Sequence, residues 1–287
     1  MPPSPDTQST PTHQALVRAA QSMAPLSATV GRLGTLLGSR HYSVDQVEAI
    51  VRLDGPLTGR LLQYANSAAS GSRTQIGTVR AAIVRVGVGW VMNLATAATV
   101  RRDLMQALPE YGLSEGELWR HSVATAIGAE VVGGAMKTEA PAEAFTAGLL
   151  HDIGKLLIAR FLDPAHLRRL AEARAAGSDA SRRAEADLIG MNHAELGGLV
   201  AAHWSLPARL VAGITYHHAP GEGHDPICDM VHVANALAKR AGGGAPADDD
   251  VRVQPDALAR LRIPPARLPA LADGVAERIE QTVASIG

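Results

Sequence analysis

Aromatic residues and cysteine are scarce in this chain of 287 residues. Tyr, Phe and Trp together make up 3% of the sequence, and Cys228 is the single cysteine. One cysteine excludes an intramolecular disulfide framework, and on an apolar helix it is expected to be a packed thiol and not a nucleophile. Few aromatic residues and abundant alanine favour helices over sheets. We therefore expect an all-α protein.

An excess of charge of either sign is also lacking. The chain has 27 basic and 28 acidic residues, a net charge of −1, and no block of five or more basic residues. Such a balance provides no field that would attract nucleic acid or an anionic membrane, so neither is expected as a partner. The N-terminal stretch MPPSPDTQSTPTHQ has no basic region followed by an apolar region, as a signal peptide would. We expect a cytoplasmic protein.

Long uninterrupted hydrophobic runs are missing as well, although 46% of the residues are hydrophobic. The nearest approach is residues 81–100, AAIVRVGVGWVMNLATAATV, which Arg85 and Asn93 interrupt and glycines split. A membrane span rarely tolerates such breaks. This segment is predicted to be a buried helix pair.

Composition and helix-breaking stretches divide the chain into four parts. Residues 1–12 are rich in Pro, Ser and Thr and are expected to be a disordered leader. Residues 13–105 are predicted to form an N-terminal helical lobe, and residues 106–242 a second helical lobe. Residues 243–287 are expected to form an acidic loop followed by one short and one longer helix.

Capping residues mark several helix starts. In the first lobe Asp54, with Pro56 in the first turn, and Thr78 are predicted N-caps. Asn66 is expected to end a helix in left-handed geometry, with Ser67 in the following loop.

The second lobe carries two capping-box patterns, Ser114 with Glu117 and Asn192 with Glu195. Pro141 is expected to open another helix, and Gly154 to permit a sharp redirection of the chain.

Five histidines and one aspartate lie on or at the ends of the predicted helices of the second lobe. They are His121, His151, Asp152, His193, His217 and His218. Neutral imidazole is a common metal ligand, and a carboxylate can bridge two ions, so converging helices could build a metal centre from these residues. The spacings match no local zinc template, and a histidine of this kind taken alone is more often a helix-end or hydrogen-bonded core residue than a ligand.

Four motifs in this order, WRHS, LLHDIGK, NHAELG and YHH, resemble the metal-dependent HD phosphohydrolase superfamily. The earlier stretches DGPLTGRLLQYANSAASG and IGTVRAAIVRVG resemble the HD-related output domain, HDOD, a bacterial signalling module. The resemblance spans roughly residues 22–240. Its signature positions are Asp54, Pro56, Asn66 and Ser67.

The resemblance implies two metal positions. In catalytic relatives such as the HD-GYP phosphodiesterases, the first uses residues matching His121, His151 and Asp152 plus a final aspartate, which is Asn235 here. A neutral amide is a poorer ligand, so the first metal should bind more weakly, unless His232 on the same helix compensates.

The second position uses the bridging Asp152 with His193, His217 and His218, all of which are present. This donor set suits iron or manganese, with zinc less favoured. Lys155 matches a lysine that contacts phosphate in active relatives, or it is simply a lysine on the helix surface.

The GYP signature is absent, because Ala219 follows the paired histidines where HD-GYP enzymes carry glutamate. Together with Asn235, this favours a noncatalytic regulator that acts through signalling protein partners, with a metal or a small phosphorylated ligand as cofactor or signal. The alternative is a metal-dependent phosphohydrolase of cyclic dinucleotides or nucleotides, with His151 and Asp152 holding the metal and Lys155 contacting phosphate. A third possibility is a helical adaptor that has lost its metal affinity.

Overall fold

The computed structural model describes residues 13–39, 41–67, 70, 75–136, 141, 143–176, 178–243 and 252–286. Within these ranges the regular elements are helices. The described residues also form one isolated antiparallel β-bridge, between Leu108 and Leu113. The all-α prediction is confirmed. The predicted leader and residues 244–251 of the predicted acidic loop lie outside the described ranges.

The N-terminal α-helices are α1 His13–Ser22, α2 Ala28–Leu37, α3 Val44–Val51, α4 Gly55–Ala65, α5 Val79–Val86 and α6 Val88–Leu104. The central ones are α7 Glu117–Ala135, α8 Ala144–Leu150, α9 Gly154–Phe161, α10 Pro164–Arg174, α11 Ser178–Ile189, α12 His193–His203, α13 Ala208–Thr215 and α14 Pro226–Arg240. The chain ends with α15 Pro255–Leu261 and α16 Leu268–Ile286, and it also contains the 3-10 helices η2 Pro109–Tyr111, η3 Pro220–Glu222 and η4 Pro265–Arg267.

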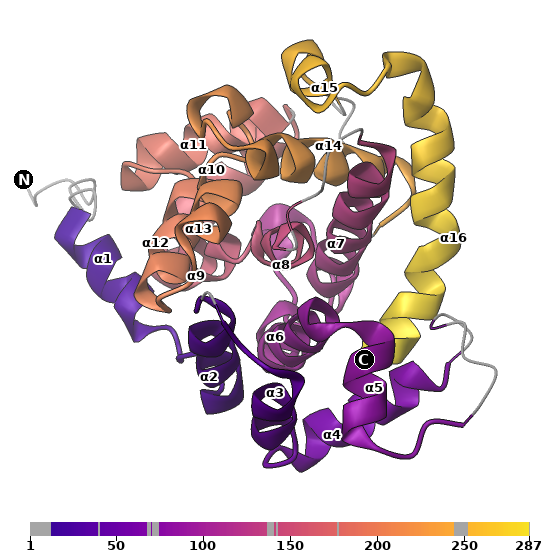
Figure 1. Ribbon diagram of the computed structural model, residues 1–287. Helices are drawn as coiled ribbons and strands as arrows, with labels where there is room; N and C mark the ends of the chain where they lie inside the picture. Colours follow the sequence, from indigo (N-terminus) through magenta and orange to yellow (C-terminus); the bar gives the residue numbers. More distant parts are fainter. Residues whose placement is uncertain are drawn as a thin grey trace, which may run out of the picture.

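Helix α7 lies between α8 and α16 (Figure 1), and it packs against α8, α14 and α16 within one continuous hydrophobic core. Small residues allow this close packing. A Cβ on Gly128 would lie 3.0 Å from the backbone oxygen of Ala234, and a Cβ on Gly148 would lie 3.0 Å from that of Thr125. Because α7 is buried along most of its length, its polar side chains His121, Ser122 and Thr125 face other helices and not water.

Helices α1 and α16 each contact helices that are distant from them in the sequence. Helix α1 packs against α12, and Trp204 Nε1 donates to Ala24 O at 3.1 Å. Helix α16 runs along α7 and also contacts α4 and α6 (Figure 1). The N-terminal and C-terminal segments thus join both helix groups, and the lobe boundaries near residues 105 and 242 stay a prediction.

The segment 81–100 forms the predicted helix pair. Helices α5 and α6 meet at Gly87, whose φ of 86° only glycine adopts readily, and their axes are bent by 104°. Across the described ranges, no individual helix has both the length and the apolar character needed to cross a bilayer. Only this bent pair satisfies both criteria when its two helices are taken together.

The predicted caps are mostly confirmed. Asp54 Oδ1 accepts from Leu57 N at 3.0 Å, while its Oδ2 accepts from Thr29 on α2 at 2.8 Å, so this signature residue also ties two helices together. Thr78 caps α5, and Asn192 forms the complete capping box of α12.

The Ser114 capping box was only half right. Glu117 accepts from Ser114 N, but Gly116, with φ of 81°, is the N-cap and separates Ser114 from the helix.

Asn66 does not adopt the predicted left-handed geometry, since its φ is −98° and its ψ is −1°. Its side chain closes a loop instead. Nδ2 donates to Leu62 O at 2.8 Å and to Ile76 O at 2.9 Å, and Oδ1 accepts from Ile76 N at 2.7 Å. The following Ser67 donates to Tyr64 O at 2.8 Å. The Asn-Ser pair of the family signature therefore fixes the exit from α4.

Substituting Asn66 with Ala is expected to lower the free energy of unfolding by about 1–2 kcal/mol, because three partly solvated hydrogen bonds are lost. Urea denaturation followed by circular dichroism measures this loss. Asn66→Asp keeps an acceptor for Ile76 N and should lose less. If the Asn66→Ala variant were as stable as the wild type, the loop after α4 would not need the Asn66 side chain to keep its conformation.

Cys228 is buried on α14, as predicted for a packed thiol, and burial raises its pKa to about 11. At pH 8 only about one thiol in a thousand is then ionised, so a thiol reagent should not react with the folded protein. Ellman's reagent is expected to report one thiol per chain only after unfolding in guanidinium. Rapid labelling under native conditions would contradict this burial.

Candidate metal centre

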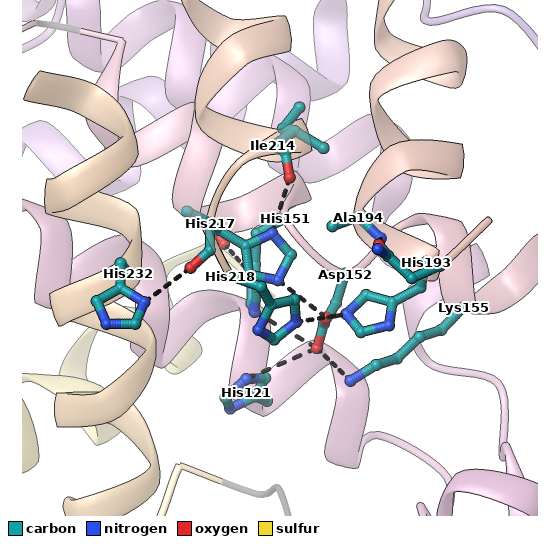
Figure 2. A network of polar contacts seen from close by, with 12 residues as sticks. His121, His151, Asp152, Lys155, His193, Ala194, Ile214, His217, His218 and His232 are labelled. Carbon is teal, nitrogen blue, oxygen red and sulfur yellow. Dashed lines mark hydrogen bonds and ion pairs between the residues drawn. The ribbon is translucent and has the colours of Figure 1, made fainter. Parts of the chain in front are cut away.

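Asp152 lies at the centre of the predicted histidine cluster (Figure 2). Its Oδ2 faces His121 Nε2 at 3.7 Å and His151 Nε2 at 3.4 Å. Its Oδ1 faces His193 Nε2 at 3.2 Å and His217 Nε2 at 4.0 Å. The two carboxylate oxygens thus address two different groups of histidines, as a bridging ligand would.

The cluster divides into two groups. One contains His121, His151 and Asp152, and the other contains His193, His217 and His218. Within each group the potential ligand atoms lie within 4.8 Å of one another. These are the residues that the sequence predicted, and the fold brings all six together from four helices or helix ends. His121 comes from α7, His151 and Asp152 follow α8, His193 begins α12, and the last two follow α13.

Local hydrogen bonds orient the imidazole rings. His151 Nδ1 lies 2.7 Å from Gly148 O, and His217 Nδ1 lies 2.8 Å from Ile214 O. A carbonyl can only accept, so Nδ1 carries the proton in both rings and Nε2 presents a lone pair toward the centre. Both Nε2 atoms are buried, and neither has a hydrogen-bond partner among the described residues. Unpaired lone pairs of this kind suit a metal ion.

His193 is held by a carboxylate that the sequence analysis missed. Glu185 on α11 is fully buried, and its oxygens accept from His193 Nδ1 at 2.8 Å and from His193 N at 2.7 Å. Tyr111 in η2 donates to the same carboxylate at 3.0 Å. Burial lowers the pKa of His193, but the carboxylates of Glu185 and Asp152 more than offset this, and the pKa is raised overall. A metal at Nε2 would release the proton held there.

The other four histidines are neutral near pH 7. Burial lowers the pKa of His151 to about 4 and lowers those of His121, His217 and His218 well below the usual value. The neutral ring is the form that coordinates a metal. His218 Nε2 lies 3.0 Å from His193 Nε2, so these two nitrogens face each other.

One of the two predictions for Lys155 is wrong, and the other, a contact with phosphate, stays a prediction. It is not a surface lysine, because its side chain is 17% exposed and its Nζ forms an ion pair with Asp152 Oδ2 at 2.7 Å. Burial would raise the pKa of Asp152, but His151 and Lys155 outweigh it and hold that pKa well below its usual range. The carboxylate is therefore ionised and ready to bind a cation.

Gly154 follows the turn at residues 151–153, which separates α8 from α9. It is the first residue of α9, and a Cβ there would lie 2.0 Å from His193 O and 2.7 Å from Gly197 N. Its role is close packing of α9 against α12, which brings His193 beside Asp152.

His232 cannot compensate for Asn235, because both of its ring nitrogens are occupied. Nδ1 lies 2.9 Å from His217 O, and Nε2 accepts from Gln254 N at 3.0 Å. Asn235 itself is 9% exposed, and its Oδ1 is buried without a hydrogen-bond partner in the described part of the chain. It is the one predicted ligand that no described hydrogen bond or ion pair joins to the cluster.

The Nδ1 of His166 pairs with Asp163 Oδ1 at 2.9 Å. This pair lies at the start of α10, where Asp163 is the N-cap. It takes no part in the cluster.

The donor set fits a divalent metal. It combines an ionised carboxylate, neutral imidazoles with fixed tautomers, and buried nitrogens that have no partner in the described protein. His121, His151 and Asp152 could hold one ion, and Asp152, His193, His217 and His218 a second. Such a centre can polarise a phosphoryl oxygen and lower the pKa of a bound water.

An all-helical fold around a centre of paired histidines and one aspartate is that of an HD-type protein. The HDOD domain family matches residues 23–220, which is more than half of the chain. The chain therefore belongs to the HDOD domain family. An uncharacterised protein of Treponema pallidum (strain Nichols) is 26% identical over 208 residues, and the match covers 71% of this chain but only 39% of that protein.

Solved structures show the same fold. An HDOD domain protein of unknown function from Geobacter sulfurreducens superposes with a TM-score of 0.69 at 21% identity, covering 95% of this chain and 96% of the other. A protein from Shewanella amazonensis SB2B, whose name proposes a phosphohydrolase, has a TM-score of 0.66 at 27% identity and coverages of 94% and 95%. A protein from Marinobacter aquaeolei VT8, whose name proposes signal transduction, has a TM-score of 0.74 at 21% identity, covering 93% and 60%.

Proposed function

We propose that this protein is a regulatory HDOD protein that carries a divalent metal in its HD-type centre and transmits a signal through contacts with a partner protein. The observation that supports the metal is the position of Asp152, whose two oxygens address separate histidine groups. Iron or manganese suits a mixed set of imidazole and carboxylate donors better than zinc.

Three features favour regulation over catalysis. Asn235 replaces the carboxylate that completes the first metal position in catalytic relatives. Lys155, which contacts phosphate in those relatives, is already paired with Asp152. Ala219 stands where the GYP signature has glutamate. In this proposal the metal and the histidines stabilise one arrangement of α7, α8, α12 and α13, and a small phosphorylated ligand at the centre would act as a signal.

A metal-dependent phosphohydrolase is the second candidate. It is favoured by the convergence of all six predicted residues at one point and by the name of the Shewanella amazonensis relative, which is 27% identical. In this role His121, His151 and Asp152 would orient one ion, and Lys155 would turn from Asp152 toward the phosphate. The metal would supply an activated water.

Hydrolysis assays separate the two candidates. Protein loaded with Mn²⁺ or Fe²⁺ would be incubated with cyclic dinucleotides, cyclic nucleotides and p-nitrophenyl phosphate, with Asp152→Ala and Lys155→Met variants in parallel. The regulatory proposal predicts metal binding without turnover above that of Asp152→Ala. If turnover requires the metal and falls in both variants, the regulatory proposal is wrong and the protein is a phosphohydrolase.

A further inference from the structure

A cavity of about 340 Å³ lies apart from the metal centre, where α6 meets α7, α8 and α14. On α7 its lining includes Glu130, nine residues beyond His121, which is about 13 Å along the helix axis. On α8 it includes Phe145, six residues before His151. The cavity is thus separate from the histidine cluster, and its volume is that of a small-molecule site.

Aromatic rings gather at this cavity although the chain has few of them. The sequence contains three Trp, four Tyr and two Phe, and one of each meets here. The ring centroids of Tyr64 and Trp90 are 4.5 Å apart, and those of Trp90 and Phe145 are 5.2 Å apart in an edge-to-face pair. Trp90 and Phe145 line the cavity, with Met230 beside them. Flat apolar walls of this kind favour a flat ring as ligand.

Hydrogen-bond donors lie on the α6 side. Asn93 is only 7% exposed and lines the cavity, and its Oδ1 accepts from Thr146 Oγ1 at 2.8 Å. This bond directs the oxygen to Thr146 and leaves Nδ2 without a partner among the described residues. Trp90 Nε1 is also buried without a partner there. Trp90 Nε1 has no accessible surface, so the Asn93 amide is the donor that this side of the cavity can offer to a ligand.

A hydrogen-bond acceptor lies on the α7 side. Glu130 Oε2 accepts from Arg278 Nη2 of α16, and no hydrogen bond from the described residues reaches Oε1. Glu130 is the one ionised side chain among the described lining residues, and Arg278 compensates its charge. The lining is therefore close to neutral, which disfavours a strongly charged ligand.

We propose that this cavity binds a neutral, flat heteroaromatic molecule with a lactam edge, an N–H beside a C=O, as in guanine or hypoxanthine. The C=O accepts from Asn93 Nδ2, the N–H donates to Glu130 Oε1, and the ring packs against Trp90 and Phe145. Adenine, which has the same size but lacks the lactam edge, matches these partners poorly.

Isothermal titration calorimetry with inosine and adenosine tests this assignment on the full chain. The two nucleosides share the sugar and the purine frame and differ in the edge presented to Asn93 and Glu130. Inosine is expected to bind at least about tenfold more tightly than adenosine. His166→Ala protein should bind inosine as the wild type does, since His166 pairs with Asp163 at the start of α10 and does not line the cavity. Absence of inosine binding, or equal affinity for both nucleosides, would overturn the proposal.

A substitution at the rim locates the binding. Gly134 lines the cavity, and a Cβ there would meet nothing within 4 Å, so a larger side chain can enter the space without displacing the fold. Gly134→Leu is expected to weaken inosine binding at least about tenfold, whereas Gly134→Ala should leave it nearly unchanged. Inosine binding that Gly134→Leu leaves unaffected would place the nucleoside elsewhere and refute the cavity as its site.

Discussion

Asp152→Ala protein is expected to bind Mn²⁺ on the order of 100-fold more weakly than the wild type, since even the loss of an outer-shell partner costs a metal site about 10–100-fold. The reason is that Asp152 contributes one oxygen to each histidine group, so its removal affects both positions at once. Titration of metal-depleted protein by calorimetry measures the change. Equal affinity of the variant and the wild type would show that Asp152 is not a ligand.

Histidine variants provide the matched comparison. His121→Ala removes a donor from one group and His218→Ala from the other, so each should weaken one binding event and spare most of the other. His166→Ala is the control, because His166 pairs with Asp163 at the start of α10 and belongs to neither group. Circular dichroism on each variant separates a lost ligand from a lost fold.

Gly154→Ala protein is expected to be less stable than the wild type by about 3 kcal/mol, the upper part of the range for overpacking in a core. The added Cβ would meet backbone atoms of α12, His193 O at 2.0 Å and Gly197 N at 2.7 Å, and backbone cannot rotate away as a side chain does. Helix α9 must therefore move away from α12. Because His193 begins α12, metal affinity should fall along with stability.

Gly59→Ala is the control for this substitution. Gly59 lies within α4, and a Cβ there would meet nothing within 4 Å. Alanine in a helix interior is favoured over glycine by roughly 0.5–1 kcal/mol, so this variant should be slightly more stable than the wild type. Guanidinium denaturation of both variants gives the two differences. A Gly154→Ala variant within about 0.5 kcal/mol of the wild type would mean that α9 and α12 need not lie this close.

Local sequence signals predicted much of the fold because each acts within one turn of a helix. Asp54 and Thr78 cap the helices that follow them, and the Asn192 box fixes His193 as the first residue of α12. Where a local signal was misleading, another residue took the role. Gly116, with its left-handed backbone, displaced Ser114 as the cap of α7.

The metal centre was predicted through resemblance and could not be derived from spacing. His121 and His218 are far apart in sequence, and only the packing of α7, α8, α12 and α13 brings their groups to Asp152. Resemblance also left out the supporting residues. Glu185 and Tyr111 are 74 positions apart and meet only in the fold.

One signal for Glu185 was present in the sequence. It lies on the same face of α11 as Ser181, Leu188 and Ile189, which are all buried. A carboxylate on the buried face of a helix needs a partner inside the protein. No comparable local signal marks Tyr111 or Gln254, since their contacts are made by backbone and side chains distant in the chain.

The metal content of the purified protein is the most direct test of the proposed centre. Elemental mass spectrometry should find one or two equivalents of iron or manganese per chain, and an Asp152→Ala, His193→Ala double variant that remains folded should have lost them. A wild-type protein that is correctly folded but binds no iron, manganese or zinc, even after incubation with each, would contradict the account and leave the histidine cluster without a metal role.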